Sequence, residues 1–221
     1  MLKRFGNVPS RLKRKAGDGV IIIAAVLIAV LIAFAAAVVL VGLSNRDADG
    51  TFFEPPQKRA GRYGEKYAAS VIKSVLREGD TLLSNVSIAY DGRPAELDCV
   101  VVNKNGVFVI EVKNYVGVLF GKENEYEWKK YKKTAAGNVY EKTVKNPIKQ
   151  VKRQVYILAK YLEYYGVDVW VQGYVMLVNG GSPVVSDFVL SDTAEIDGVL
   201  HKRGRTALTR ETVAKIKELL E

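Results

Sequence analysis

Residues 95–113 read AELDCVVVNKNGVFVIEVK, and this stretch decides the fold of the chain. Its two apolar runs flank Asn105-Gly106, a dipeptide that favours a tight β-hairpin turn. The second run, residues 107–110, does not alternate with polar residues, which is typical of a central strand covered on both faces. Charged side chains are rare in such strands, so Asp98 and Glu111 are candidates for chemistry.

The charged residues of this hairpin are spaced so that they can meet on one face of a sheet. Alternation along a strand places Glu111 and Lys113 on the same face, about 6.5–7 Å apart. The turn brings Asp98 opposite Glu111 or nearby, and alternation also predicts that Glu96, Asp98 and residues 100 and 102 share a face. Mg²⁺ takes carboxylate oxygens and keeps several waters, and a lysine can stabilise developing negative charge. The pattern indicates metal-dependent phosphodiester hydrolysis, although Glu-x-Lys alone is also typical of an exposed ion pair.

Helices and further strands are predicted around this hairpin. Residues 58–78 carry apolar side chains at helical spacing, and Glu65 borders their buried face, where it could supply a third oxygen ligand. Asn146-Pro147 opens another helix, in which Gln150 and Gln154 lie on a polar row typical of a solvated edge. We also expect strands at 81–90, 169–178 and near 184–190, an irregular hairpin within 115–145, and a last helix from Thr209.

Hydropathy divides the chain into four parts. Residues 20–43 contain no charged side chain, and a helix of this length exceeds the ~30 Å hydrocarbon core of a bilayer. We therefore expect a basic segment at 1–19, a transmembrane helix at 20–43, a polar linker at 44–57 and one domain at 58–221. Cleavage of the apolar segment as a signal peptide, which would release a secreted nuclease, is the alternative.

The charge distribution bears on orientation and on the substrate. Residues 1–19 hold six Lys and Arg against one Asp, so the positive-inside rule places the N-terminus of this single-pass membrane protein in the cytoplasm. A nuclease that acts on the cell's own nucleic acid would also face the cytoplasm, so the side of the domain stays open. Residues 58–165 hold 20 Lys and Arg against 12 Asp and Glu, which suits a polyanionic substrate.

Cysteine and histidine usage narrows the possible chemistry. The chain has one Cys and one His, which excludes an internal disulfide framework and a cysteine-based zinc site and disfavours a Ser-His-Asp triad. We expect Cys99 to be a small core residue that points away from Asp98, and His201 to be solvated.

Basic residues in the irregular hairpin and on the helix after it are candidates for nucleic-acid binding. The run WKKYKK at 128–133 combines charge with aromatic rings, as in proteins that bind nucleic acid by stacking. A solvated hairpin tip explains the same run equally well. The candidates are Lys129, Lys130, Lys132, Lys133, Lys149 and Arg153.

Five separated blocks, in order, resemble the nuclease-related domain (NERD) family of the PD-(D/E)xK nuclease superfamily. The resemblance covers roughly residues 58–165. The blocks are Gly61-x-x-Gly64-Glu65, Glu96-Leu97-Asp98-Cys99 with the valines that follow, Gly106 to Lys113 with Asn114-Tyr115-x-Gly117, Trp128, and Asn146-Pro147-Ile148-x-Gln150.

The resemblance implies a restriction-endonuclease-like α/β fold, with a mixed central sheet flanked by helices and preceded here by the transmembrane helix. It implies Asp98, Glu111 and Lys113 as the catalytic residues, and Glu65 and Gln150 as supporting residues. Mg²⁺ or Mn²⁺ would be held by Asp98, Glu111 and Glu65. We expect a membrane-anchored nuclease that hydrolyses DNA in preference to RNA; the alternative is a catalytically silent, membrane-tethered module that binds nucleic acid or a protein.

Overall fold

The computed structural model describes residues 26–37, 40, 55–179, 182–202 and 207–221. The chain divides into two units between Pro55 and Pro56, and each unit is described by itself. In the first unit, residues 26–37 are helical and exposed. Within the described residues, no helix has both the length and the apolar character needed to cross a bilayer. The basic segment 1–19, much of the expected membrane helix 20–43 and most of the linker lie outside the described residues.

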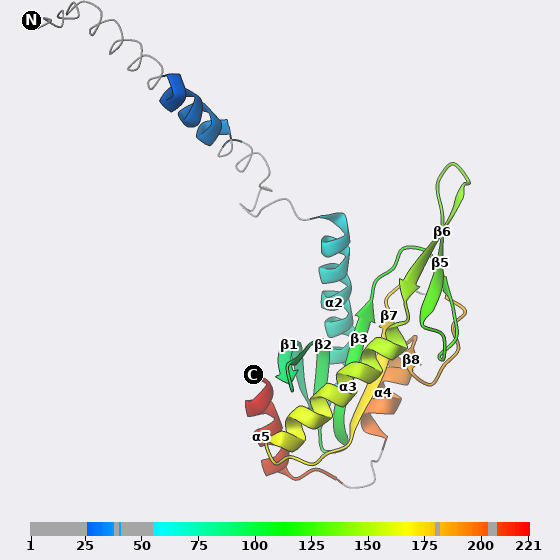
Figure 1. The fold of residues 1–221 in the computed structure, drawn as a ribbon. Coiled ribbons are helices and arrows are strands. Elements are labelled where there is room, and N and C mark those ends of the chain that lie inside the picture. Colours follow the sequence, from blue (N-terminus) through cyan, green and yellow to red (C-terminus); the bar gives the residue numbers. More distant parts are fainter. Residues whose placement is uncertain (1–25, 38–39, 41–54, 180–181, 203–206) are drawn as a thin grey trace, which may run out of the picture. The chain divides into compact units, whose positions relative to one another are not determined.

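The second unit is a mixed α/β fold whose central sheet has five strands in the order β1-β2-β3-β7-β8 (Figure 1). The first three strands are antiparallel neighbours, and β3, β7 and β8 run parallel. The elements are α2 (Pro56–Val75), β1 (Thr81–Tyr90), β2 (Arg93–Asn103), β3 (Gly106–Lys113), β4 (Val118–Phe120), β5 (Glu127–Lys133), β6 (Val139–Lys145), α3 (Pro147–Tyr164), β7 (Val171–Leu177), β8 (Val189–Leu190), α4 (Thr193–His201) and α5 (Arg210–Leu220).

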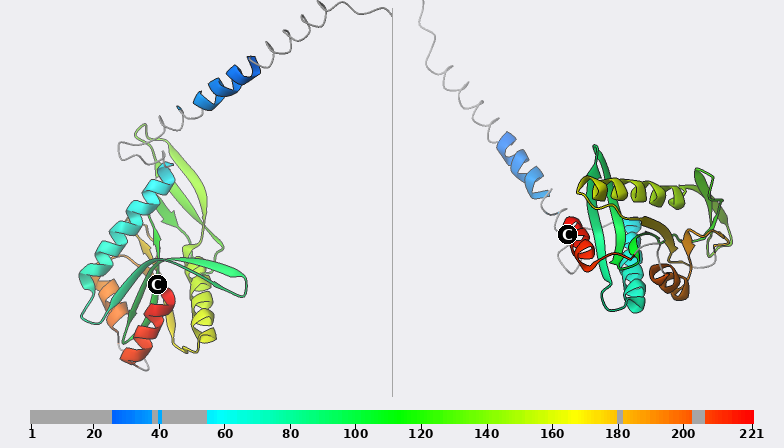
Figure 2. Two further views of the ribbon diagram at one scale, coloured as in Figure 1. Left: turned by 90° about the vertical axis from the view of Figure 1, so that its left-hand side faces the viewer. Right: turned by 90° about the horizontal axis from the view of Figure 1, so that it is seen from below.

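Helices cover both faces of the sheet, as the right-hand view of Figure 2 shows for α3 on one side and α2 and α4 on the other. Side chains of α3 and α5 join one buried cluster, and side chains of α2 and α4 join a second. Gly173 on β7 allows α3 to approach closely, since a Cβ there would lie 2.5 Å from Val155 Cγ2. The expected mixed sheet flanked by helices is confirmed for this unit.

The central strand β3 agrees with its sequence pattern. All of its residues are buried except Lys113, which is partly exposed. It pairs with β2 on one side and, through the crossover that contains α3, with the parallel strand β7 on the other. Strands with neighbours on both edges and helices on both faces are typically apolar along their length, so a buried charge such as Glu111 is unusual.

The alternation of faces predicted for β2 fails at Asp98. Leu97 and Val100 pack into the same buried cluster although they are an odd number of residues apart. The residue that would pair with Asp98 on β1, Asn85, leaves the ladder and adopts a positive φ of 56°. This local break turns Glu96 to solvent while Val100 stays in the core, so the predicted shared face of Glu96, Asp98 and residues 100 and 102 is wrong.

A second sheet of three antiparallel strands, β4-β5-β6, replaces the expected irregular hairpin between β3 and α3. Trp128 is fully buried and its Nε1 donates to Lys122 O at 3.0 Å. Asn146 caps α3, because its side-chain oxygen accepts a hydrogen bond from Ile148 N at 2.9 Å. Its amide also donates to three main-chain carbonyls of residues 122, 123 and 125. The cap therefore ties the start of α3 to the small sheet.

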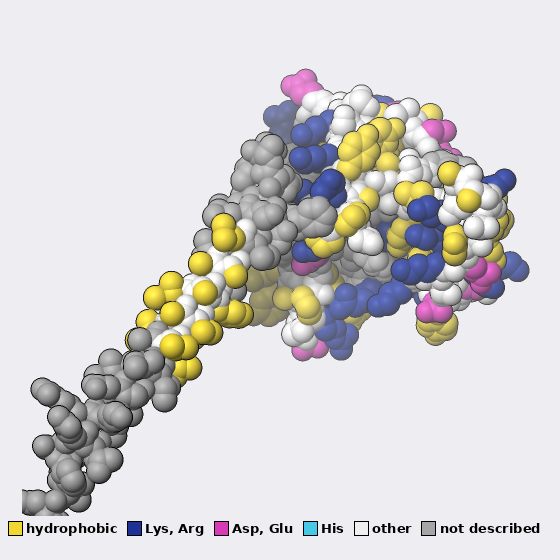
Figure 3. Space-filling view, turned by 90° about the horizontal axis from the view of Figure 1, so that it is seen from above, with side chains coloured by type: hydrophobic (Ala, Val, Ile, Leu, Met, Phe, Trp, Pro, Cys, Tyr) yellow, Lys and Arg dark blue, Asp and Glu magenta, His cyan; other side chains and the backbone are white. Residues whose placement is uncertain are grey.

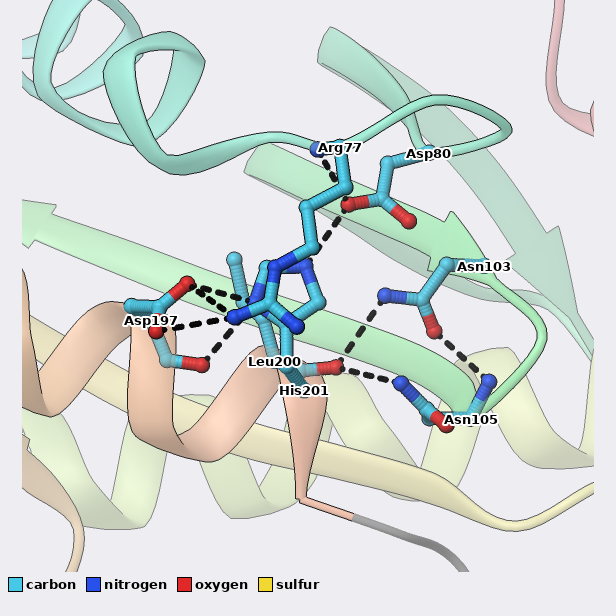
Figure 4. A network of polar contacts seen from close by, with 7 residues as sticks. All are labelled: Arg77, Asp80, Asn103, Asn105, Asp197, Leu200 and His201. Carbon is cyan, nitrogen blue, oxygen red and sulfur yellow. Dashed lines mark hydrogen bonds and ion pairs between the residues drawn. The ribbon is translucent and has the colours of Figure 1, made fainter.

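The structure corrects the expectation that His201 is solvated. It ends α4, a helix that the sequence analysis did not predict, and its side chain is only 7% exposed. Its Nε2 lies 2.8 Å from Asp80 Oδ2 and its Nδ1 lies 2.7 Å from Asp197 Oδ1, and Arg77 bonds the same Asp197 (Figure 4). This network joins α4 to the loop between α2 and β1.

Candidate active site

Glu111 lies at the C-terminal end of β3, is 1% exposed, and accepts hydrogen bonds on both carboxylate oxygens. Its Oε1 accepts from Gln150 Nε2 at 2.6 Å and contacts Lys113 Nζ. Its Oε2 accepts from Gln154 Nε2 at 2.6 Å. The pairing of Glu111 with Lys113 confirms that the two share a face. The opposed charge and the amides of α3 together satisfy a carboxylate that would otherwise be very costly to bury.

Asp98 lies on the neighbouring strand, next to this carboxylate. Its Oδ2 accepts from Val112 N at 2.7 Å, which fixes it beside the end of β3. Burial, and after it the negative charge of Glu111, together raise the pKa of Asp98 to about 7, although the Val112 hydrogen bond and Lys113 act in the opposite direction. Two like charges held together without a full counter-charge are typical of a site that receives a cation.

Lys113 is the positive member of the group. Burial by itself would lower the pKa of Lys113, but the charge of Glu111 and the bond to it outweigh burial, so the pKa lies above its usual value. The lysine therefore stays protonated at neutral pH. A fixed ammonium group within reach of two carboxylates can stabilise negative charge that develops on a substrate.

Glu65 on α2 lies close enough for its charge to raise the pKa of Asp98. The close approach of α2 to this region depends on Gly64, since a Cβ there would lie 2.5 Å from Asn114 Cβ. Asn114 follows Lys113 and donates from Nδ2 to Ala60 O at 2.7 Å, which ties α2 to the end of β3.

The predicted three-acid metal set is not assembled as such. Within the described ranges, no group of three or more His, Cys, Asp and Glu side chains is arranged to hold a metal ion. Asp98 and Glu111 come together, and the role of Glu65 as a third ligand stays a prediction. A pair of carboxylates is compatible with Mg²⁺, which completes its shell with waters and substrate oxygens.

The basic candidates for nucleic-acid binding fall into two groups. Lys132 and Lys133 are exposed at the end of β5, whereas the others have protein partners. Lys129 pairs with Glu141 at 2.8 Å, and Arg153 donates to Pro94 O at 3.2 Å. Two more lie over aromatic rings, Lys130 over Tyr115 and Lys149 over Tyr126.

The face seen from above in Figure 3 carries the N-terminal part of α2 and the β5–β6 hairpin. Lys and Arg side chains gather on it in several clusters, with fewer Asp and Glu side chains among them. Such a distribution attracts polyanions, and paired lysines still contribute to that field.

Gln154 is a site residue that the sequence analysis missed. The polar row of Gln150 and Gln154 predicted a solvated helix edge, and Gln150 is indeed exposed, but Gln154 is buried and bonds Glu111. The signal available in the sequence was the i, i+4 spacing of two amides, which places both on one helix face.

A cleft of about 1060 Å³ lies elsewhere, along β7, β8 and α4. Its lining includes Trp170, Tyr174 and Glu195 but neither Asp98, Glu111 nor Lys113. Its size therefore carries no argument about the carboxylate site, where hydrogen bonds and charge define the candidate chemistry.

The fold is a mixed α/β domain with two carboxylates and a lysine at the end of its central strand, and comparison with known families places it. The model of the nuclease-related domain (NERD) family matches residues 60–178, more than half of the chain, so the chain belongs to this family. An uncharacterized protein of Bacillus anthracis is 32% identical over 72 residues, which are 32% of this chain and 34% of that protein. The match thus spans about a third of that relative. No solved structure matches the chain.

Proposed function

We propose that this protein is a metal-dependent nuclease whose active residues are Asp98, Glu111 and Lys113. One observation carries the proposal: a buried Glu111 is paired with a protonated Lys113 beside an Asp98 whose pKa is raised to about 7. A structural ion pair needs no second carboxylate next to it. Membership of the nuclease-related family adds independent support.

The residues present fit Mg²⁺ or Mn²⁺. Both divalent ions prefer oxygen ligands, and Asp98 and Glu111 offer carboxylate oxygens from adjacent strands. The pKa of Asp98 is raised first by burial and then by the charge of Glu111, and a divalent cation would supply positive charge that favours the ionised carboxylate. Such a cation, when bound, polarises the phosphate and lowers the pKa of a coordinated water.

The side chains of Asp98, Lys113 and Glu111 have different roles in the proposed reaction. Asp98 must lose its proton to act as a ligand, and a pKa of about 7 lets it do so near neutral pH. Lys113, which stays protonated, is placed to stabilise the negative charge that develops on the phosphate oxygens. Glu111 is anchored through Oε2 by the buried amide of Gln154, so the carboxylate keeps its orientation when the partners of Oε1 exchange.

The substrate and the location are part of the same proposal. The basic excess of residues 58–165 suits a nucleic acid, and we propose DNA in preference to RNA. Lys132 and Lys133, which are exposed at the end of β5, would contact its backbone. We further propose that residues 20–43 anchor the protein in a membrane, because they carry no charge over a length that spans a bilayer.

Cleavage by the full-length chain tests the proposal. Linear, circular and single-stranded DNA and RNA are incubated with Mg²⁺, Mn²⁺ or EDTA, beside Asp98→Asn and Lys113→Met. Lys104→Met, at the other end of the same hairpin, is the matched control. Cleavage that needs the metal, is lost in the first two variants and survives in the third supports a nuclease. Cleavage that persists in EDTA or in Asp98→Asn contradicts it.

One observation favours a silent binding module as the second candidate. Both oxygens of Glu111 already accept hydrogen bonds from the protein's own side chains, which compete with a metal ion. A protein that binds DNA in EDTA with strong salt dependence, cuts no substrate and binds no divalent cation would be this module.

A further inference from the structure

The side-chain amide of Gln154 is buried, and its nitrogen and its oxygen differ in their hydrogen bonding. The residue is 3% exposed. Its Nε2 donates to Glu111 Oε2 at 2.6 Å and to the main-chain oxygen of Glu96 at 2.8 Å, so both amide hydrogens are used. Its Oε1 is buried and has no hydrogen-bond partner in the part of the chain that the structure describes. The amide therefore acts entirely as a donor.

The orientation of this amide is fixed by its surroundings. Turning it over would place Oε1 against two acceptors, Glu111 Oε2 and Glu96 O, and would leave both without a donor. The orientation that is found leaves one acceptor unsatisfied, which destabilises the fold. A leucine of similar size would avoid this cost. What the glutamine adds is therefore its pair of hydrogens, one of which holds Glu111.

The two oxygens of Glu111 are held in different ways. Oε1 bonds Gln150, which is exposed, and Lys113, whose side chain is 19% exposed. Partners that reach solvent can exchange for water or for a ligand. Among the described residues, Oε2 accepts only from Gln154, whose amide is buried away from bulk solvent. Oε1 is thus the exchangeable oxygen and Oε2 the anchored one.

We propose that Gln154 is a positioning residue that makes Glu111 a one-oxygen ligand and thereby favours Mg²⁺ over Ca²⁺. The inference rests on the proposed metal site. Mg²⁺ takes single oxygens in a strict octahedron, whereas Ca²⁺ accepts both oxygens of a carboxylate in a larger, more flexible shell. By occupying Oε2, Gln154 removes the two-oxygen mode that suits Ca²⁺.

Metal binding to the full-length chain tests this without any cleavage assay. Mg²⁺ and Ca²⁺ are titrated separately by calorimetry into the wild type and Gln154→Leu, and the ratio of the two dissociation constants is compared. Loss of an outer-shell hydrogen bond typically weakens metal binding about 10-fold or more, so we expect Mg²⁺ affinity to fall by about 10-fold and Ca²⁺ affinity to fall less. Gln172→Leu, a partly buried glutamine on β7 that bonds Tyr174, is the matched control.

The outcomes separate this inference from the proposed function. A Mg²⁺ preference that drops in Gln154→Leu but not in Gln172→Leu supports the positioning role. A ratio that does not change while the wild type binds Mg²⁺ overturns it and leaves the metal site standing. If the wild type binds neither ion, the proposed function fails and this inference fails with it. Should Gln154→Leu not fold, Gln154→Met, which is unbranched and adaptable, is measured against the same two expectations.

Discussion

Replacing Asp98 with asparagine should stabilise the metal-free protein while it removes function. The pKa of Asp98 is raised from 3.8 to about 7, first by burial and then by Glu111. Between these pH values the folded protein binds more protons at this site than the unfolded chain. The free energy of unfolding therefore falls as the pH rises through this window, and the full penalty applies above pH 7.

The size of this effect follows from the separation of the two pKa values. About three units, at about 1.4 kcal/mol each, give an upper bound of about 4 kcal/mol. Part of this shift comes from the charge of Glu111, so we expect Asp98→Asn to gain about 2–4 kcal/mol at pH 8. Asparagine keeps an oxygen that can accept from Val112 N, so this hydrogen bond need not be lost.

Urea denaturation in EDTA measures the gain, at pH 8 and again near pH 4. The difference between Asp98→Asn and the wild type should be much smaller at the lower pH, where the folded carboxyl is protonated and the unfolded carboxyl is close to half protonated. Asp91→Asn, in the exposed turn between β1 and β2, is the control and should change stability by less than about 0.5 kcal/mol. Asp98→Asn that is no more stable than the wild type at pH 8 would refute the reasoning, as would a gain that is equally large at both pH values.

Three further substitutions test the neighbourhood of the site and the fold behind it. Lys113→Met should lower the cleavage rate by about 10²–10³-fold. It should also raise Mn²⁺ affinity in calorimetry, because it removes a cation that competes for Glu111. An unchanged cleavage rate would contradict the proposed role of Lys113. Gly64→Ala should lower the melting temperature, because its Cβ would lie 2.5 Å from a side-chain atom at the end of β3. Gly61→Ala is the control and should leave the melting temperature unchanged, because no atom lies nearer to its Cβ than 3.9 Å. Equal effects of the two substitutions would contradict this packing argument. His201→Ala should lower the free energy of unfolding, measured by chemical denaturation, by about 1–3 kcal/mol, because it leaves the buried carboxylate of Asp80 with fewer partners. An unchanged free energy of unfolding would show that the network of Figure 4 adds no net stability.

The sequence predicted those parts of the fold that depend on local rules. Asn146 as a cap, the turn at Asn105-Gly106 and the unbroken apolar run of β3 each have a short-range cause, and the structure has all three. The pairing of Glu111 with Lys113 follows from strand alternation in the same way. These features need no knowledge of what packs against them.

The parts that were missed depend on contacts between distant segments. The shared face predicted along β2 fails because β1 breaks its ladder at Asn85, which lies well before Asp98 in the chain. The position of Gln154 on its helix, beside the apolar stripe, is also typical of a solvated residue. Its burial depends on Glu111, which lies on another element and bonds its amide. His201 becomes buried because Asp80, 121 residues away, meets it.

The turn of the β2–β3 hairpin is stabilised by hydrogen bonds, whereas its open end carries groups that cost stability. This difference explains how the fold can tolerate the site. At the turn, buried Asn103 and its neighbour Asn105 both donate to Leu200 O at 3.1 Å, so α4 holds the closed end of the hairpin. At the open end, burial disfavours the charged form of Asp98, and Gln154 Oε1 has no hydrogen-bond partner among the described residues. A hairpin whose turn is fixed and whose apolar strand is buried can hold like charges together at its far end, since separating them would require unpairing the central strand.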